Sequence, residues 1–274
     1  METSGTTRLL AILGDPVGHS LSPALQNAAI HALGLDAVYV ALRTPATAFD
    51  TVLKALAAVG GAGNVTVPHK EAAERSVTRK TDLCARVGAC NTFWTENGTL
   101  VGDNTDVHGI TMSLRSAGAD GAGRWLVIGT GGAARAVAIA AGDAKARLVV
   151  RSRDPNRARG FVDWAKTRNV NAEAAADGAI QCDLAVNATP LGLRAGDALP
   201  LAPDVLRETK AAMDLVYAAG ETAWVRALRA AGVRAADGRE LLVQQGAAAF
   251  ERFFPGEDAP VEVMRAAVSR ALRA

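Results

Sequence analysis

The chain has 274 residues, and its 30 Lys and Arg against 28 Asp and Glu leave a net charge of +2. This length suits two domains of ordinary size, and the near balance of charge excludes a strong attraction to nucleic acid or to an anionic membrane. The apolar stretch Leu9–Leu13 is too short for a signal-peptide core or a membrane span. We therefore expect a cytoplasmic protein, a monomer or a homodimer, whose partner is a small neutral or anionic molecule.

The cysteines and histidines carry no metal signature. Cys84, Cys90 and Cys182 are odd in number and show no Cys-x-x-Cys spacing, so neither a disulfide framework nor a zinc site is expected. The four histidines, at positions 19, 31, 69 and 108, do not stand at helical ligand spacing to one another. We expect buried thiols and no metal.

Short apolar runs alternate with amphipathic stretches, which is typical of parallel strands joined by helices. In the first half we expect strands at 9–13, 37–42, 63–67, 89–94 and 99–102, and helices at 23–33, 44–59, 69–76 and 107–117. Ser22 is the expected cap of the helix that starts at Pro23, and Asp103 is the expected cap of the helix near 107. The glycine-rich stretch Gly118–Gly123 is the expected domain junction.

The second half predicts a dinucleotide-binding fold, with strands at 125–128, 147–150, 184–187 and 212–215 separated by helices. The last two helices, at 240–253 and 261–272, have no strand between them, so we expect them to pack back on the first domain. The predicted architecture is α/β with two domains. Residues 1–108 form a mostly parallel substrate-binding and catalytic domain, residues 109–239 a Rossmann-like nucleotide-binding domain, and residues 240–274 the returning helices.

A glycine-rich turn follows the strand at 125–128 and leads into an alanine-rich helix. Gly129, Gly131 and Gly132 let the strand turn sharply, so that backbone N–H groups can approach a pyrophosphate at the positive end of the helix. A bare structural turn is the alternative, because a strand, a glycine turn and a helix also occur without a ligand. The context favours a nucleotide site, which leaves the substrate and its chemistry to the preceding half of the chain.

Four polar segments of the first half lie near strand ends, where a parallel sheet presents its ligand-binding edge. They are 14–23, 64–70, 91–92 and 102–106. Their hydroxyls, amide, lysine and carboxylate suit a polyhydroxylated acid. Each of these residues also has a structural alternative when taken alone. Ser22 can cap a helix, Thr66 can be an ordinary strand residue, and Asn91 can stabilise a turn. Lys70 is harder to explain structurally, because a cation at the positive end of a helix is slightly unfavourable.

In these residues the chain resembles the shikimate dehydrogenases, which reduce 3-dehydroshikimate to shikimate with NADPH in the biosynthesis of chorismate and the aromatic amino acids. The matching segments run nearly from end to end, and several motifs in the same order are far more specific than any one of them. They are 14–27 with Ser20-Leu-Ser22, 64–70, Gly88-Ala-Cys-Asn-Thr92, 102–106, 129–136, Asn187-Ala-Thr-Pro-Leu-Gly192, Asp214-Leu-Val-Tyr217 and 238–250.

The resemblance implies that Lys70 is the catalytic acid and base and that Asp106 is its partner at the reacting hydroxyl. Oxidation of a secondary alcohol sends a hydride to nicotinamide and a proton to a base, and reduction reverses both transfers. We assign Asp106 to orienting Lys70 and the hydroxyl rather than to activating Lys70. His69 and His19 are rival bases, which are disfavoured because neighbouring side chains of an extended segment point to opposite sides.

The resemblance also implies a substrate site for a polyhydroxylated cyclic carboxylic acid. Ser20 and Ser22 would hold its carboxylate, and Thr66, Asn91 and Gln245 would bind its other polar groups. Tyr217 would close the pocket from the cofactor domain.

The cofactor would contact residues of the glycine turn and of later strand ends, with a further contact at Asp82. These residues are Gly129, Thr130, Gly131, Gly132, Ala133, Ser152, Arg153, Arg157, Thr189, Leu215, Gly238 and Leu241.

Arg153 and Arg157 can clamp a 2′-phosphate, which favours NADP over NAD. The usual Asn-Arg-Thr of the family is Ser152-Arg153-Asp154 here. Asp154 either caps the helix that begins at Pro155 or repels the phosphate and admits NAD, and both readings stay open. We expect the Rossmann-like domain to bind NADP, with NAD as the alternative.

The expected activity is that of an NADP-dependent shikimate dehydrogenase, with the reaction in a cleft between two α/β domains. One alternative is a relative that oxidises quinate or aminoshikimate with NAD. Ser22 disfavours quinate, because threonine at this place goes with quinate use in related enzymes. The other alternative is a catalytically lapsed nucleotide-binding paralogue, which the full set of polar site residues disfavours.

Overall fold

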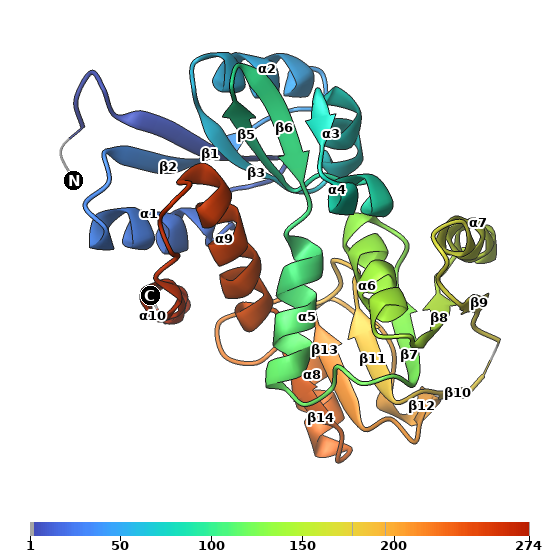
Figure 1. Cartoon of the computed structure of the whole chain (residues 1–274). Coiled ribbons are helices and arrows are strands. Elements are labelled where there is room, and N and C mark those ends of the chain that lie inside the picture. The colour runs from blue at the N-terminus through green and yellow to red at the C-terminus, as the bar shows by residue number, and fades with distance from the viewer. Residues whose placement is uncertain (1–2, 177, 195, 274) are drawn as a thin grey trace. The chain divides into compact units, whose positions relative to one another are not determined.

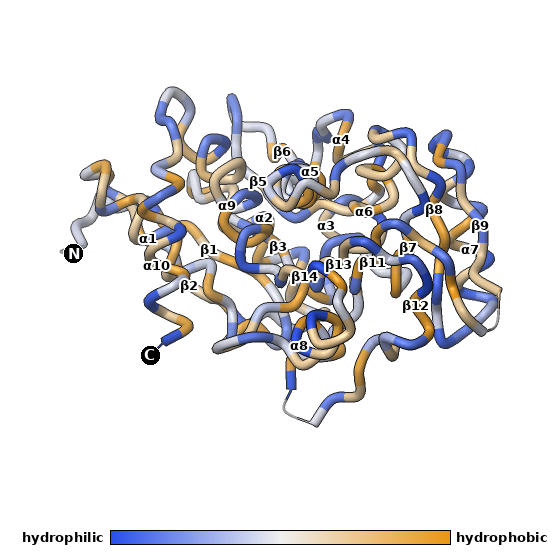
Figure 2. Tube along the Cα trace, turned by 90° about the horizontal axis from the view of Figure 1, so that it is seen from below, coloured by the Kyte–Doolittle hydropathy of each residue, from blue (hydrophilic) through white to orange (hydrophobic). Residues whose placement is uncertain are grey.

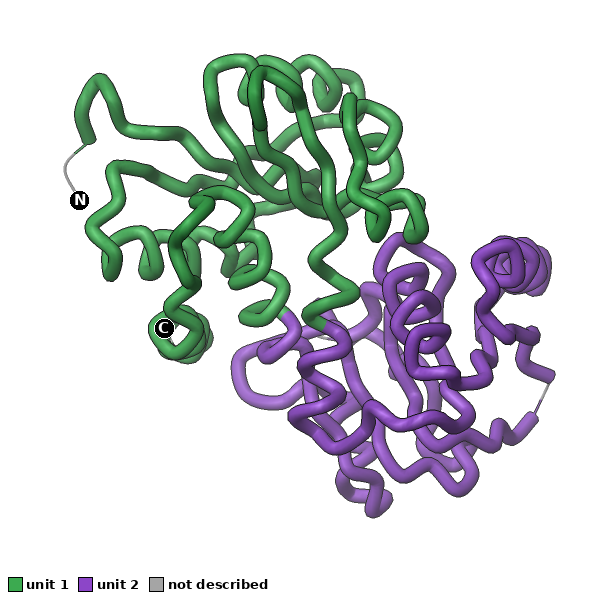
Figure 3. The backbone as a smooth tube through the Cα atoms, viewed as in Figure 1, with its two compact units in different colours: residues 1–109, 242–274 green, residues 110–241 purple. Residues whose placement is uncertain are grey.

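The computed structural model describes residues 3–176, 178–194 and 196–273. The chain divides into two compact units, one formed by Met1–Gly109 with Leu242–Ala274 and the other by Ile110–Leu241 (Figure 3). The chain leaves the first unit inside helix α5 (Asp106–Ser116) and returns inside α9 (Arg239–Phe253). Gly118–Gly123 therefore lies within the second unit and is not the junction. The functional domains expected at 1–108, 109–239 and 240–274 stay a prediction.

The first unit is built on a six-stranded sheet in the order β2-β1-β3-β5-β6-β4 (Figure 1). β1 pairs in parallel with β2 and β3, whereas β5 runs antiparallel to both β3 and β6. β6 therefore runs in the same direction as β3, and the carboxyl ends of β1, β3 and β6 share one edge with the start of β5. The strands are β1 (Arg8–Gly14), β2 (Ala37–Arg43), β3 (Ala62–Val65), β4 (Arg79–Lys80), β5 (Thr92–Glu96) and β6 (Thr99–Asp103).

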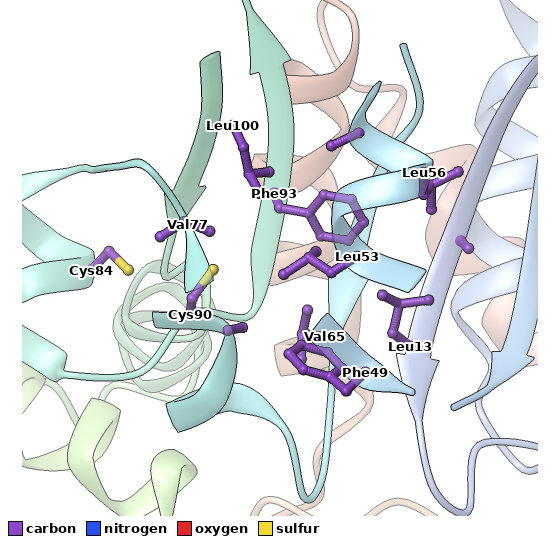
Figure 4. Packing of buried hydrophobic residues seen from close by; sticks show 13 residues of the cluster. Leu13, Phe49, Leu53, Leu56, Val65, Val77, Cys84, Cys90, Phe93 and Leu100 are labelled. Carbon is purple, nitrogen blue, oxygen red and sulfur yellow. The ribbon is translucent and has the colours of Figure 1, made fainter. Parts of the chain in front are cut away.

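Helices cover this sheet and enclose its core. They are α1 (Ser22–Ala32), α2 (Phe49–Ala58), α3 (Lys70–Ser76), α4 (Asp82–Val87), the residues of α9 from Leu242 onward and α10 (Val261–Ala271), which packs against α1. Figure 4 shows one buried cluster, in which Phe49 and Leu53 of α2 meet Val65 and Phe93 of the sheet. The cluster fixes α2 and the strand ends that carry the polar segments.

Two expected helix caps and one expected helix start are wrong, because the residues concerned make other contacts. α1 begins at Ser22 without a side-chain cap. α2 begins at Phe49, because the N–H of Thr44 extends the β1–β2 pairing by donating to the Gly14 carbonyl at 2.9 Å. Asp103 does not cap α5, since its carboxylate accepts from Thr81, the Asn104 N–H and Arg252.

The second unit has a six-stranded parallel sheet in the order β14-β13-β11-β7-β8-β9. Read from β9, the strands follow the order of a dinucleotide-binding Rossmann fold, in which ligands lie outside the carboxyl ends where the order reverses. The reversal falls between β7 and β11. The strands are β7 (Arg124–Ile128), β8 (Arg147–Arg151), β9 (Ala172–Ala174), β11 (Leu184–Asn187), β13 (Ala211–Asp214) and β14 (Arg234–Ala236).

The helices of this unit are α6 (Gly132–Asp143), α7 (Pro155–Lys166), α8 (Ala223–Ala230) and the short 3-10 helix η1 (Pro203–Val205), and a two-stranded sheet pairs β10 (Ile180–Gln181) with β12 (Leu206–Arg207). Hydrophobic residues follow the buried strands such as β1 and β7 (Figure 2). The expected fold class, a mostly parallel α/β unit beside a Rossmann-like one, is confirmed. No helix in the described ranges has the length and apolarity needed to cross a membrane.

Candidate active site

A lysine and a carboxylate meet at the edge where β3 and β6 end. Lys70 is the first residue of α3, which follows β3, and Asp106 is the first residue of α5, which follows β6. The Lys70 Nζ donates to Asp106 Oδ2 at 2.6 Å, and their side chains are 17% and 11% exposed. Such a pair, shielded from water yet at the sheet edge, can exchange a proton with a bound hydroxyl or carbonyl.

Asn91, just before β5, holds the other side of this carboxylate. Its Nδ2 donates to Asp106 Oδ1 at 2.8 Å, while its Oδ1 accepts from the Thr105 N–H at 2.7 Å. The Gln245 Oε1 of α9 lies 3.4 Å from the same Nδ2. The structure thus brings together four of the residues predicted from the sequence, namely Lys70, Asp106, Asn91 and Gln245.

A second layer of buried polar residues was missed by the sequence analysis. Asn64 donates from Nδ2 to the Asn91 carbonyl at 3.1 Å, and the Tyr39 hydroxyl donates to Asn64 Oδ1 at 2.7 Å. Burial raises the pKa of the Tyr39 phenol well above its ordinary value, so the hydroxyl stays a donor at neutral pH. An asparagine inside the apolar strand at 62–65 was the signal that could have revealed this layer.

The serines lie beside this layer. The Ser20 Oγ accepts from the Ser22 N–H at 3.2 Å, and the Ser22 hydroxyl interacts with the Tyr39 phenol. Thr66 lies against Gly14, where a Cβ atom would come 2.4 Å from the Thr66 Cγ2, so only glycine lets the end of β1 approach so closely. Their contacts with a substrate stay predictions.

His69, one of the rival bases, has a packing role. Its ring is buried and stacks on Phe49 with 4.5 Å between centroids, and its Nε2 lies 2.6 Å from the Thr44 carbonyl. The other rival, His19, is exposed. Lys70, not His69, is the neighbour of Asp106.

In the second unit, the glycine turn has the geometry that a pyrophosphate requires. Gly129 adopts φ +114°, and a Cβ atom there would lie 2.9 Å from the Ala188 carbonyl. Gly131 is the N-cap of α6 and has no side chain that could cap the N–H groups of the first turn. A Cβ at Gly131 would meet nothing within 4 Å, which leaves open space over these donors. This turn, with Thr130, Gly132 and Ala133, fits a dinucleotide.

Other predicted cofactor residues lie at the neighbouring strand ends of this unit. Thr189 follows β11 and donates its hydroxyl to Asn187 Oδ1 at 2.7 Å. Gly238 follows β14, and a Cβ there would lie 2.3 Å from the carbonyl of Leu215, the residue after β13. Leu241 lies in the first turn of α9. These positions are compatible with cofactor binding, which stays a prediction for each of these residues.

The segment after β8 shows what Asp154 does. Asp154 is the N-cap of α7, and its Oδ1 accepts from the Asn156 N–H at 2.8 Å. The Ser152 Oγ accepts from the Asp154 N–H at 3.2 Å, and the Arg157 Nε lies 3.9 Å from Asp154 Oδ2. Arg153 is exposed and forms no ion pair with the residues that the structure describes. The prediction that Asp154 caps the helix beginning at Pro155 is confirmed. Its predicted effect on a 2′-phosphate stays a prediction.

The two remaining predicted site residues, Asp82 and Tyr217, belong to different units. Asp82 is exposed in the first turn of α4, whose cap is Thr81. Tyr217 is half-buried in the second unit, beyond β13. Among the described residues, no group of three or more His, Cys, Asp or Glu side chains is arranged to hold a metal.

A Rossmann-like unit with an open glycine turn, next in the chain to an α/β unit with a lysine–aspartate pair, defines a nicotinamide-nucleotide-dependent dehydrogenase. Residues 12–93 match the shikimate dehydrogenase substrate binding domain, and residues 238–268 match the shikimate 5'-dehydrogenase C-terminal domain. The chain belongs to the shikimate dehydrogenase family.

Individual relatives match over nearly their whole length. The chain is 41% identical to the shikimate dehydrogenase (NADP(+)) of Rubrobacter xylanophilus, over 97% of this chain and 96% of the relative. It superposes with a TM-score of 0.88 and 36% identity on the Thermus thermophilus enzyme solved with NADP(H) and shikimate, covering 96% and 99% of the two chains. The Listeria monocytogenes enzyme, solved with shikimate and NAD, gives a TM-score of 0.83 at 26% identity, covering 97% and 98%.

Proposed function

We propose that this chain is an NADP-dependent shikimate dehydrogenase that reversibly reduces 3-dehydroshikimate to shikimate. The observation that carries the proposal is the contact of 2.6 Å between Lys70 Nζ and Asp106 Oδ2 at the carboxyl edge of the first sheet. Relatives of the same length that bear this name support it. A cytoplasmic location and a monomeric or homodimeric state stay predictions.

Lys70 acts as the acid in reduction. As an ammonium ion bonded to Asp106, it donates a proton to the carbonyl oxygen of the substrate as that oxygen gains negative charge, and it recovers a proton from solvent afterwards. NADPH, when bound, supplies the hydride. In the reverse direction Lys70 takes the proton of the same hydroxyl.

Asp106 and Asn91 position this acid. Asp106 is bonded on both oxygens, by Lys70 and by Asn91, so its carboxylate cannot rotate freely. A fixed carboxylate holds the ammonium group in one place and can also accept from the substrate hydroxyl, which lowers the entropic part of the barrier. Gln245 extends the same hydrogen-bonded set toward the substrate, and Ser20, Ser22 and Thr66 line the same edge.

Residues of the second unit hold the cofactor. The N–H groups of the α6 first turn receive the pyrophosphate, and Arg153 and Arg157 receive the 2′-phosphate. Leu215, Gly238 and Leu241 lie beside the nicotinamide, with Thr189 near the glycine turn. Asp82 of the first unit is a further cofactor contact, and Tyr217 closes the substrate pocket from the second unit.

The test is the rise in absorbance at the NADPH band when purified protein meets shikimate and NADP. Lys70→Ala should lower kcat by about 100-fold or more while shikimate still binds, because it removes the proton donor and acceptor. Lys54→Ala, which removes an exposed lysine of the same unit paired with Asp50 at 2.7 Å, should leave kcat within about twofold.

Three outcomes would contradict the proposal. Full activity of Lys70→Ala would remove Lys70 from the chemistry. Faster turnover of quinate with NAD would make the chain a quinate dehydrogenase. Nucleotide binding without oxidation of any polyol would indicate a lapsed paralogue.

A further inference from the structure

A cavity of about 270 Å³ lies inside the second unit, between α5 and the sheet. All of its lining residues fall within Ile110–Leu241. They include Ser113 and Leu114 of α5, Leu184 of β11, Met213 of β13, Ala236 of β14 and Asp237 just after it. None of the predicted substrate or cofactor residues, all of which the structure describes, lines this cavity. The proposed activity therefore gives it no role.

The cavity is open to solvent on one side. The lining residues Ser116, Ala117 and Arg234 are exposed, whereas Ser113 and Met213 are buried. The exposed residues mark the mouth of the cavity and the buried ones its inner wall. A small molecule can thus enter without unfolding of α5 or of the sheet.

Two buried polar atoms at the inner wall have no hydrogen-bond partner among the described residues. They are Ser113 Oγ and Asp237 Oδ2, in residues that are 7% and 8% exposed. Asp237 Oδ1 accepts from the N–H and the Nε of Arg239 at 3.1 and 2.9 Å, whereas Oδ2 lies 2.8 Å from Arg239 Nη2 without the alignment of a hydrogen bond. Unpaired buried polar atoms are costly. A molecule that bonds to Ser113 would therefore gain an interaction that the folded chain itself does not provide.

The charges around the cavity are balanced. Asp237 and Glu240 are negative, and Arg234 at the mouth and Arg239 beside Asp237 are positive. The rest of the lining is apolar or carries a hydroxyl. Because a charged ligand would find no surplus of opposite charge here, the lining favours a neutral and mostly apolar molecule.

The volume indicates the size of that molecule. An engineered apolar cavity of about 150 Å³ binds benzene, so a cavity of about 270 Å³ can hold two fused rings. We propose that this cavity is a second binding site, for a neutral molecule of two fused rings that carries a hydroxyl group. The hydroxyl bonds to Ser113 Oγ, and the rings pack against Leu114, Leu184 and Met213. This site goes beyond the proposed function and does not depend on it.

The probe is 2-naphthol, and naphthalene, which has the same rings without the hydroxyl, is its matched control. Dissociation constants of both are measured from ligand fluorescence with the full chain. Ser113→Ala should raise the Kd of 2-naphthol about tenfold, because it removes one buried hydrogen bond. The same variant should leave the Kd of naphthalene within about twofold, since the apolar walls are unchanged.

The methionine methyl groups report where the probe binds. Met213 lines the cavity, whereas Met264 is buried in α10 of the first unit. In proton–carbon NMR spectra, 2-naphthol should shift the methyl signal of Met213, assigned with Met213→Leu, and leave that of Met264 in place. Ala236→Leu fills the cavity and should abolish the binding of both probes, with thermal unfolding as the check that this variant is folded.

Two results would overturn the inference. If 2-naphthol left the Met213 signal of the wild type unmoved, the cavity would hold water only, bonded to Ser113 and Asp237. If Ser113→Ala weakened both probes equally, the serine would support the fold and not the ligand. Oxidation of shikimate by the same preparation tests the proposed function separately, so the two failures are distinguishable.

Discussion

At the scale of residues, the position of Lys70 depends on buried groups that never touch it. The Tyr39 hydroxyl bonds to Asn64, Asn64 bonds to the backbone of Asn91, and Asn91 bonds to the partner of Lys70. Buried polar groups are costly unless they are paired, so each member of this series keeps the next in one orientation. Strands β2 and β3, which carry Tyr39 and Asn64, therefore help to fix the position of the Lys70 ammonium group.

Tyr39→Phe tests this coupling. The change removes a buried donor and leaves Asn64 Oδ1 without its bond of 2.7 Å, so the free energy of unfolding should fall by about 1 to 2 kcal/mol. Because Asn64 Nδ2 keeps its bonds to Asn91 and Thr92, kcat should fall by less than about tenfold, far less than in Lys70→Ala. Denaturant unfolding and steady-state kinetics measure the two effects. A variant as stable as the wild type would show that the Tyr39 hydroxyl does not support the site.

The sequence analysis found the residues at strand ends but not the residues behind them. Lys70 and Asp106 could be predicted because a strand end followed by polar residues marks the ligand edge of a sheet. Asn64 in an apolar run was a signal of a buried polar layer, but its bond to Tyr39 could not be predicted, because it joins two strands whose order in the sheet is unknown from the sequence. Ser22 and Asp103 were wrongly expected as caps because tertiary partners, Tyr39 for one and Arg252 for the other, compete with the local cap.

At the scale of elements, long periodic segments were predicted well and short edge strands were not. The strands at the centre of each sheet, such as β7 and β11, are continuous apolar runs and lie within a few residues of expectation. β4 and β10 have two residues each, and their pairing partners rather than their own composition define them. The start of α2 was misplaced because a strand contact of Thr44 extends past the apolar run.

Asp183 directly precedes β11 and joins its start to the starts of β7 and β13 in the second sheet. Its Oδ2 accepts from the N–H of Arg124 at the start of β7, and its Oδ1 accepts from Lys210 just before β13. The Arg124 N–H, and then the Lys210 side chain, hold the pKa of this carboxyl below its ordinary value of 3.8. The folded state therefore favours the ionised form. The stability it contributes is complete above the unfolded value and is lost as the pH falls through the folded value.

Asp183→Asn should therefore have a pH-dependent effect. At pH 7 the free energy of unfolding should fall by about 0.5 kcal/mol, a small value because the side chain is 42% exposed and screened by solvent. The difference in Tm between variant and wild type should shrink as the pH falls from 5 to about 3. Thermal unfolding across this range measures it. Asp204→Asn, an exposed change in the same unit, is the control, and an equal deficit of Asp183→Asn at pH 3 and pH 7 would contradict the assignment.

At the scale of the whole molecule, the two sets of site residues belong to different units. Lys70, Asp106 and Asn91 come from the segment before Gly109, and Gln245 comes from the segment after Leu242, so the first unit needs both ends of the chain. The glycine turn and the segment after β8 lie within Ile110–Leu241. From the sequence, the return of the last helices could be inferred only from the absence of a strand between them. The chain crosses between the units inside α5 and α9, each of which continues as one helix through the crossing.

This division predicts that each ligand protects its own unit in hydrogen–deuterium exchange. NADP alone should slow exchange of the backbone amides at 129–134 and 152–157, because a bound nucleotide occupies these donors and stabilises the state that binds it. Shikimate alone should slow exchange at 20–22, 64–70 and 104–107 instead. Lys70→Ala should keep the NADP pattern unchanged, since Lys70 lies in the other unit. If NADP alone protected 20–22, 64–70 and 104–107 as strongly as shikimate does, the assignment of cofactor residues to the second unit would fail. Separate patterns that add when both ligands are present would support the view that each unit carries its own binding residues.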